Sequence, residues 1–238
     1  MIPPSTGSLA LVPVPLAPIA VESSLPAATL ARVRSADLVF AESAKSARAF
    51  LQSAQTAHRI QTITIEAFSA DTPAATLRAL LAPVVAGRDA IVVSEAGAPG
   101  IADPGARLVH VAHQLGIPVV PCVGPSAVLL ALMASGLEGQ RFAFHGYLPV
   151  AAGPLAERIK ALEQSARRER ATQLFIETPY RNDRLIAALI AHGQSRTRLV
   201  IAADLTGPNE WIRSATLAEW RTHPPIGKRP AVFLIGAE

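Results

Sequence analysis

The strongest constraint on the fold is an alternation of short apolar runs with longer Ala/Leu-rich segments of helical period. In the first half, the runs that predict strands are Leu9–Pro15, Asp37–Ala41, Thr62–Phe68, Ala90–Ser94 and Val119–Val123. The segments that predict helices between them are Ala27–Val33, Ala44–Gln55, Pro73–Val85 and Pro104–Leu115, with Asp71 and Asp103 placed to cap the last two. This alternation predicts right-handed crossovers and a mainly parallel sheet with helices on both faces.

The second half also alternates predicted strands with predicted helices, but two of its strands are joined by a short turn. Strands are expected at Phe142–Leu148, Gln173–Thr178, Arg198–Leu205, Trp211–Thr216 and Ala231–Ile235, and helices at Ala156–Arg168 and Arg181–His192. The turn from Leu205 to Trp211 is short and contains glycine and proline, which favours an antiparallel pair. We therefore predict two α/β domains, a mainly parallel one over residues 1–123 and a mixed one over residues 124–238.

The composition fits a chain with a sizeable core. Of its 238 residues, 50% are hydrophobic and 17% are charged, which excludes global disorder. Cys122 is the single cysteine, so an internal disulfide framework and a cysteine-based zinc cluster are both excluded. His110 and His113 lie three residues apart, but no third ligand is evident nearby, and we predict no metal site.

Charge is spread unevenly along the chain. Residues 1–140 carry 8 basic and 9 acidic side chains, whereas residues 141–238 carry 14 and 9. A basic second half suits a polyanion, but the surplus is too mild to establish nucleic-acid binding. The run Arg167–Arg170 has two interpretations, a solvated helix end or a contact to RNA.

The opening of the chain is uncharged up to Glu22. It has no basic n-region, and prolines at positions 3, 4, 13, 15 and 18 interrupt any helical h-region, so it is not typical of a signal peptide. No other stretch approaches the length of a membrane-spanning apolar helix. We expect a soluble cytoplasmic protein.

The most informative segment is the loop Ser94–Gly105, Ser-Glu-Ala-Gly-Ala-Pro-Gly-Ile-Ala-Asp-Pro-Gly. It follows a buried-looking strand, and ligands of open α/β sheets bind at such carboxyl ends. Its glycines and alanines let backbone groups approach a ligand closely, more than a plain turn requires. It is neither a P-loop nor a dinucleotide fingerprint, because the residue types and spacing differ.

A second loop, Val123–Ala127, opens the apolar helix Val128–Ala134, where Ser126 can cap the helix or face a ligand.

These motifs together resemble the tetrapyrrole methylase superfamily. The resemblance rests on the strand that ends in Pro15, the Ser94–Gly105 loop, Gly124-Pro125-Ser126-Ala127 and Glu177-Thr178-Pro179-Tyr180-Arg181. It is strongest to the branch that methylates a ribose 2′-hydroxyl of small-subunit ribosomal RNA, and it runs from about residue 8 to 237. It implies two α/β domains with S-adenosylmethionine folded into the cleft between them, and a homodimer.

The resemblance also implies a set of cofactor contacts, made largely through backbone and small side chains. In the first domain they are Pro15, Ser94, Ala96, Gly97, Ala98, Ile101, Ser126 and Ala127. In the second domain they are Glu177, Leu205, Thr206, Pro230 and Ala231.

Two residues are candidates for catalysis. Glu42 lies at the end of the second strand, where the family places an acidic group, and is the candidate general base; its alternative is a salt bridge to Lys45. Arg181 is the candidate clamp for a phosphate or carboxylate; its alternative is pairing with Asp183 or Glu177.

The substrate side departs from the ribosomal RNA branch. Leu16-Ala17-Pro18 stands in place of Gly-Asn, Ser43-Ala44-Lys45 in place of Asp-Thr-Arg, and Glu95 in place of Asp. Lys228-Arg229-Pro230-Ala231 is more similar to the tetrapyrrole enzymes. Three hypotheses therefore stay open: an RNA ribose methyltransferase acting on ribosomal RNA or the small ribosomal subunit, a methyltransferase of a tetrapyrrole or other small molecule, and a cofactor-binding protein without turnover.

Overall fold

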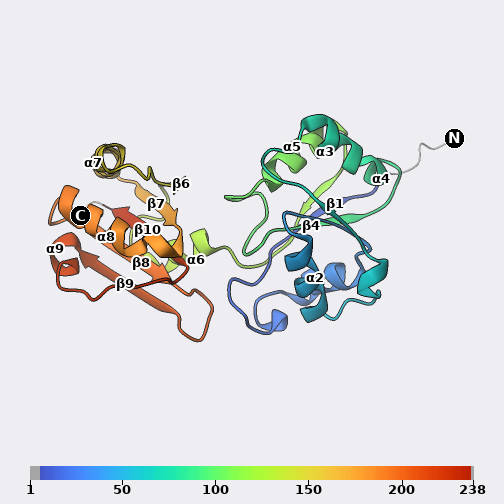
Figure 1. Cartoon of the computed structure of the whole chain (residues 1–238), viewed down its shortest axis with the longest axis horizontal. Helices are drawn as coiled ribbons and strands as arrows, with labels where there is room; N and C mark the ends of the chain where they lie inside the picture. Colours follow the sequence, from blue (N-terminus) through green and yellow to red (C-terminus); the bar gives the residue numbers. More distant parts are fainter. Residues whose placement is uncertain (1–5, 237–238) are drawn as a thin grey trace. The chain divides into compact units, whose positions relative to one another are not determined.

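The computed structural model describes residues 6–236, which divide between Ser126 and Ala127 into two compact units (Figure 1). Each unit is built on its own five-stranded sheet.

The sheet of the first unit is parallel throughout. Its strands are β1 (Leu9–Val12), β2 (Leu38–Ala41), β3 (Thr64–Ala67), β4 (Ala90–Val93) and β5 (Val119–Pro121), in the order β3-β2-β4-β1-β5. The central strands β1, β2 and β4 are almost wholly buried, as expected when helices cover both faces of a parallel sheet.

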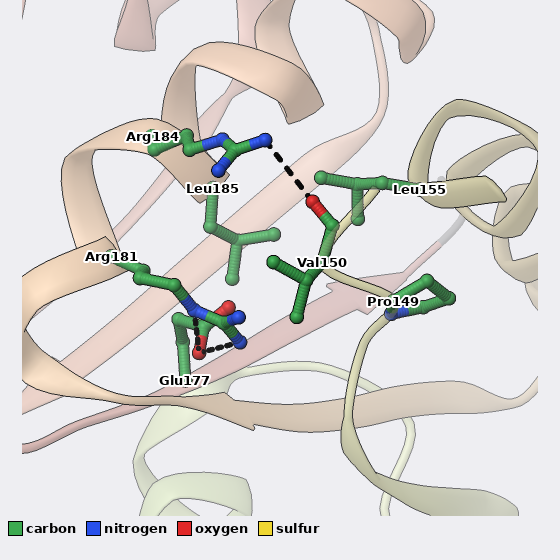
Figure 2. A pocket seen from close by; sticks show the side chains of 7 residues that line it. All are labelled: Pro149, Val150, Leu155, Glu177, Arg181, Arg184 and Leu185. Carbon is green, nitrogen blue, oxygen red and sulfur yellow. Dashed lines mark hydrogen bonds and ion pairs between the residues drawn. The ribbon is translucent and has the colours of Figure 1, made fainter. Parts of the chain in front are cut away.

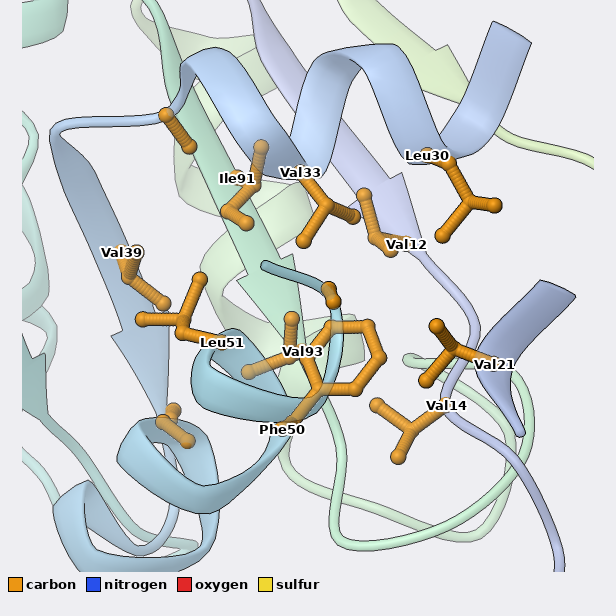
Figure 3. Close-up of a cluster of buried hydrophobic side chains, with 14 of the residues drawn as sticks. Val12, Val14, Val21, Leu30, Val33, Val39, Phe50, Leu51, Ile91 and Val93 are labelled. Carbon is orange, nitrogen blue, oxygen red and sulfur yellow. The ribbon is translucent and has the colours of Figure 1, made fainter. Parts of the chain in front are cut away.

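Two hydrophobic clusters flank this sheet. On one face, Leu30 and Val33 of α1 (Ala27–Ser35) and Phe50 and Leu51 of α2 (Ala44–Ser53) pack over strand residues such as Val93 (Figure 3). The other face is covered by α3 (Ala74–Leu80), α4 (Ala82–Val85) and α5 (Gly105–Gln114). Short 3-10 helices η1 (Val21–Ser23) and η2 (Ile60–Thr62) complete the unit.

The second unit has a mixed sheet. Its strands are β6 (Phe142–Tyr147), β7 (Thr172–Glu177), β8 (Arg198–Ala203), β9 (Trp211–Thr216) and β10 (Ala231–Gly236), in the order β6-β7-β10-β8-β9. Only β6 and β7 pair in parallel; the other neighbours are antiparallel.

Helices of the second unit lie on both faces of its sheet. Helix α6 (Ala127–Ser135) contacts β8, β9 and β10. Helices α7 (Ala152–Glu169) and α8 (Asn182–His192) pack on the other face around Phe175 and Phe233, whose rings stack with centroids 5.9 Å apart. The short α9 (Leu217–Trp220) closes this core with the buried Trp220, and η3 (Pro179–Arg181) precedes α8.

The fold class is confirmed: one parallel and one mixed α/β sheet. The antiparallel pairing of β8 with β9 is also confirmed. The single helix predicted over Pro73–Val85 is wrong, because the chain forms two helices that divide at Leu81. Pro83, two residues later, has no N–H and crowds the preceding turn. Asp71 does not cap α3; its backbone N–H instead donates to Ser69 Oγ in a turn.

Several predicted strands are longer than those observed. The first ends at Val12 because Pro13 and Pro15 lack the N–H that a ladder needs, and the fifth ends at Pro121. Helix α7 begins at Ala152, four residues before the predicted start. Among the helices of residues 6–236, none is long and apolar enough to cross a membrane.

Candidate functional site

Three strands of the first unit end side by side. In the sheet register, Ala41 of β2 lies opposite Val93 of β4, which lies opposite Val12 of β1. The segments that follow these residues therefore leave the sheet at one edge, which is where open α/β sheets bind ligands.

The loop after β4 is tied to the segment after β1. Val14 and Gly97 form an antiparallel bridge in which each backbone N–H donates to the other carbonyl, over 2.9 and 2.8 Å. Gly97 has a φ of +74°, and a Cβ built there would lie 3.2 Å from Leu16 Cδ2. A side chain at this position is therefore both strained and crowded.

Two polar side chains hold the same loop from within. The Ser94 hydroxyl donates to the Gly97 carbonyl oxygen over 2.8 Å. Asp103 Oδ1 accepts from the backbone N–H groups of Gly100, over 2.6 Å, and of Gly105, over 2.8 Å. Gly105 is the first residue of α5, so Asp103 does bond the start of that helix, as predicted.

The surface that this loop presents is small and largely apolar. Ala96 is exposed, Ile101 is 48% exposed, and Pro15 and Ala98 are half-buried. The Ser94 hydroxyl is already bonded within the loop. Apart from the exposed carboxylate of Glu95, a ligand here would therefore meet mainly backbone groups and methyl groups.

Glu42 directly follows β2 and is exposed at this edge. Burial of part of the carboxyl group raises its pKa, and the negative charges of Asp103 and Glu95 raise it further. No hydrogen bond or ion pair joins Glu42 to another residue within 6–236, so the alternative salt bridge to Lys45 does not form. Burial also raises the pKa of Asp103, against the two backbone N–H groups that lower it.

The second predicted loop reaches the same part of the unit. A Cβ at Gly124 would lie 2.6 Å from the Pro13 side chain, so only glycine allows this approach to the end of β1. Ser126 is buried, and its hydroxyl bonds to no group in the described part of the chain. Ala127 is half-buried and begins α6.

In the second unit, the predicted residues also meet at one end of the sheet. Glu177 of β7 lies opposite Ala231 of β10, which lies opposite Ala203 of β8. Pro230 precedes this row, and its carbonyl accepts from the backbone N–H of Asp204 over 3.0 Å. Leu205 and Thr206 follow.

Thr206 combines two costly features. It is a β-branched residue with a φ of +65°, and its Oγ1 is buried without a hydrogen-bond partner. Each feature costs free energy, about 1–2 kcal/mol for the left-handed backbone and about 1–3 kcal/mol for the unsatisfied hydroxyl. Strain of this kind clusters at ligand sites.

Arg181 pairs with Glu177, the alternative that the sequence left open. Its Nε donates to Glu177 Oε1 over 2.9 Å, and a second guanidinium nitrogen donates to the same oxygen (Figure 2). Thr178 N–H adds a third bond to that oxygen, over 2.6 Å. The pair lines a pocket with Arg184, whose guanidinium donates to the Val150 carbonyl over 3.1 Å. The other lining residues are Pro149, Leu155 and Leu185.

The run Arg167–Arg170 lies at the other end of this sheet. It ends α7 just before Thr172, which begins β7, whereas Glu177 ends that strand. Five residues of strand separate the two ends by about 17 Å at about 3.3 Å per residue. Arg168 pairs with Glu169 at 2.7 Å, and Arg167 donates to Gln194.

Some residues that organise the site were not predicted. Val14 was predicted only as part of the first strand, because no local pattern marks its bridge to Gly97. Asn182 and Asp183, which fasten the loop before β10, look like an ordinary polar helix start. No group of three or more metal-ligating side chains is found in residues 6–236.

Comparison with known proteins finds a family that this chain matches over most of its length. Residues 17–220 match the family described as Tetrapyrrole (Corrin/Porphyrin) Methylases. "Ribosomal RNA small subunit methyltransferase I" of Mesorhizobium japonicum is 37% identical over 151 residues, which are 63% of this chain and 50% of that protein. The protein of the same name from Pseudomonas aeruginosa is 40% identical over 133 residues, 56% of this chain and 46% of that protein. The chain spans about half the length of these curated relatives.

Solved structures match over nearly the whole chain. Diphthine synthase has a TM-score of 0.68 at 18% identity and covers 97% of this chain and 90% of that one. Uroporphyrin-III C-methyltransferase from Thermus thermophilus, complexed with S-adenyl homocysteine, has a TM-score of 0.52 at 19% identity and covers 97% of both chains. At these identities the likeness shows a shared fold.

Proposed function

The chain belongs to the tetrapyrrole (corrin/porphyrin) methylase family, and we propose that it is an S-adenosylmethionine-dependent methyltransferase acting on a ribose 2′-hydroxyl of small-subunit ribosomal RNA. The acceptor is proposed from the curated relatives, which are named as methyltransferases of ribosomal RNA. The prediction of a homodimer, and the prediction that one cofactor molecule contacts both units, stay predictions.

The observation that carries cofactor binding is the Gly97 bridge. It places a crowded, left-handed glycine beside an apolar edge made of Ala96, Ala98 and Ile101. A Cβ at Gly97 would lie 3.2 Å from the Leu16 side chain, so glycine lets the loop and the segment after β1 approach this closely. The chain thus offers a cradle of small side chains suited to a flat, largely apolar group such as adenine, with the carboxylates of Glu42 and Glu95 nearby.

The buried, unpartnered Thr206 hydroxyl supports a second contact. A ligand that bonds Oγ1 would satisfy a group that is otherwise costly. Leu205 directly precedes Thr206 in the chain. Pro230 and Ala231 lie beside Asp204 and Ala203, and Glu177 lies opposite Ala231. These residues fit the cofactor contacts that the family resemblance implies.

When bound, S-adenosylmethionine supplies an electrophilic methyl group on a sulfonium. Holding the acceptor oxygen in line with that group provides much of the rate, because positioning replaces a bimolecular encounter. A hydroxyl acceptor must also lose its proton as its oxygen gains the methyl group. We propose Glu42 as the base that takes this proton, since its raised pKa makes it a stronger base than an ordinary glutamate.

Replacing Thr206 with glycine should weaken cofactor binding without lowering stability. The change removes an unsatisfied hydroxyl and a strained φ, which offset the entropy cost of glycine, about 0.5–1 kcal/mol. We expect an unchanged or higher unfolding temperature by calorimetry, and a clearly larger Kd for S-adenosylhomocysteine by isothermal titration. A lower unfolding temperature with unchanged Kd would show that Thr206 is only structural.

The proposed function is tested by methyl transfer to small ribosomal subunits that lack the modification. The purified chain should first bind S-adenosylmethionine in isothermal titration, and then transfer its tritiated methyl group to the subunit RNA. Nuclease digestion should place the label on a ribose. Cofactor binding with transfer to a small acidic acceptor but not to RNA would support the small-molecule alternative, and binding without any transfer would support a protein that has lost turnover.

A further inference from the structure

Beside the Glu177 end of the second sheet, one aromatic ring stands out from the surface with a cation over it. Tyr180, in η3, is 79% exposed, and the Lys228 ammonium lies 4.8 Å from the centre of its ring. Lys228 is exposed and forms no ion pair within the described residues. Its charge is therefore held by the negative face of the ring alone.

The segments that carry these two side chains are fastened together. Helix α8 begins at Asn182, two residues after Tyr180, and Asn182 is wholly buried. Its side chain and that of Asp183 bind the backbone on both sides of Lys228. The four bonds join Asn182 Nδ2 to the carbonyls of Gly227 (3.0 Å) and Arg229 (2.7 Å), and Asp183 Oδ1 to the N–H groups of Ile226 (2.9 Å) and Gly227 (3.3 Å). The backbone segments that carry the ring and the cation are thus held together before any ligand arrives, which reduces the entropy lost on binding.

The charges around the ring favour an anionic partner. Arg181 is paired with Glu177, and the Asp183 carboxylate accepts from two backbone N–H groups. Lys228 and Arg184 have no acidic partner among the described residues, so the cations here outnumber the carboxylates. An exposed aromatic ring with cations beside it is the arrangement that binds unpaired nucleotides, because each base can stack on the ring while its phosphate meets the cation. A paired base has both faces covered and gains nothing from such a ring.

We propose that Tyr180 and Lys228 form a platform for one unpaired nucleotide of the substrate RNA. The base stacks on the exposed face of Tyr180, and Lys228 lies near a phosphate of the same strand. This proposal rests on the proposed function and names the form of RNA that the site accepts. It also assigns substrate contact to the Glu177 end of the sheet, in place of the Arg167–Arg170 run.

The test compares variants in binding to a fluorescently labelled single-stranded RNA and to a duplex of the same sequence. Tyr180→Ala should weaken single-strand binding by about 5- to 150-fold, the loss of one stacked base, and should leave duplex binding unchanged. Tyr180→Phe keeps the ring and should bind as the natural chain does. Lys228→Ala should lower the slope of log affinity against log salt by about 0.7. The matched control is a double Arg167→Ala, Arg168→Ala variant at the far end of the sheet. It should keep the preference for single-stranded RNA over the duplex, and it should transfer methyl groups to subunits as the natural chain does.

The outcomes separate this proposal from the proposed function. The platform alone would be overturned if Tyr180→Ala transferred methyl groups to subunits at the natural rate. It would also be overturned if Tyr180→Phe and Tyr180→Ala weakened single-strand binding equally. Tyr180-dependent RNA binding without any methyl transfer would support the platform and overturn the proposed function. Cofactor titration of each variant, with an unchanged Kd, shows that the variants are folded.

Discussion

Replacing Gly97 with valine should abolish cofactor binding, with a Kd for S-adenosylhomocysteine at least about 100-fold larger, which corresponds to about 2.8 kcal/mol. Two effects act together. The valine side chain would enter the space beside Leu16, where even a Cβ lies 3.2 Å from Cδ2. A β-branched residue at a φ of +74° would also pull the loop out of its bridge to Val14.

Gly116 provides the matched control. It has a φ of +69° after α5, and a Cβ there would meet nothing within 4 Å. Gly116→Val therefore carries the same backbone strain, about 1–2 kcal/mol, without filling the loop. We expect it to lower the unfolding temperature while cofactor affinity stays unchanged. A Gly97→Val variant that is folded by circular dichroism and binds the cofactor normally would move the site away from this loop.

The sequence predicts the sheets well because burial leaves a local pattern. Runs such as Ala90–Val93 are apolar at every position, as a strand covered on both faces must be, and the proline after β1 marks its end. The strand order β3-β2-β4-β1-β5 leaves no such pattern, because pairing is decided by contacts between residues far apart in the sequence.

The site is predicted less completely, for the same reason. The composition of the Ser94–Gly105 loop predicts a ligand-contacting loop, but its bridge to Val14 depends on the neighbouring strand and leaves no local signal. The left-handed backbone at Thr206 contradicts the preference of a β-branched residue, so no propensity argument finds it. The distance between the Arg167–Arg170 run and Glu177 follows only from the direction of β7, which places them at opposite ends of one strand.

Replacing Glu42 with glutamine should lower the rate of methyl transfer by about 10²- to 10⁴-fold, the usual contribution of a general base, while the cofactor Kd stays unchanged. The variant should not be less stable at neutral pH. A carboxyl whose pKa is raised in the folded state contributes stability below its unfolded pKa and loses it as the pH rises through the folded pKa. At pH 7 the folded chain therefore bears the cost of a charged Glu42, and glutamine removes that cost. Thermal unfolding of both proteins checks this.

The pH dependence of the methyl-transfer rate tests the assignment of Glu42 as the base. A base works only when deprotonated, so the transfer rate of the natural chain should fall on the acid side, with a midpoint above the ordinary glutamate pKa of 4.5. Glu95→Gln removes a negative charge that raises the pKa of Glu42, so it should move this midpoint to lower pH and leave the maximal rate intact. Glu42→Gln should abolish the acid limb altogether. If the limb survives in Glu42→Gln, or does not move in Glu95→Gln, another group takes the proton, and the acidic residues at the ends of β2 and β4 only shape the local field.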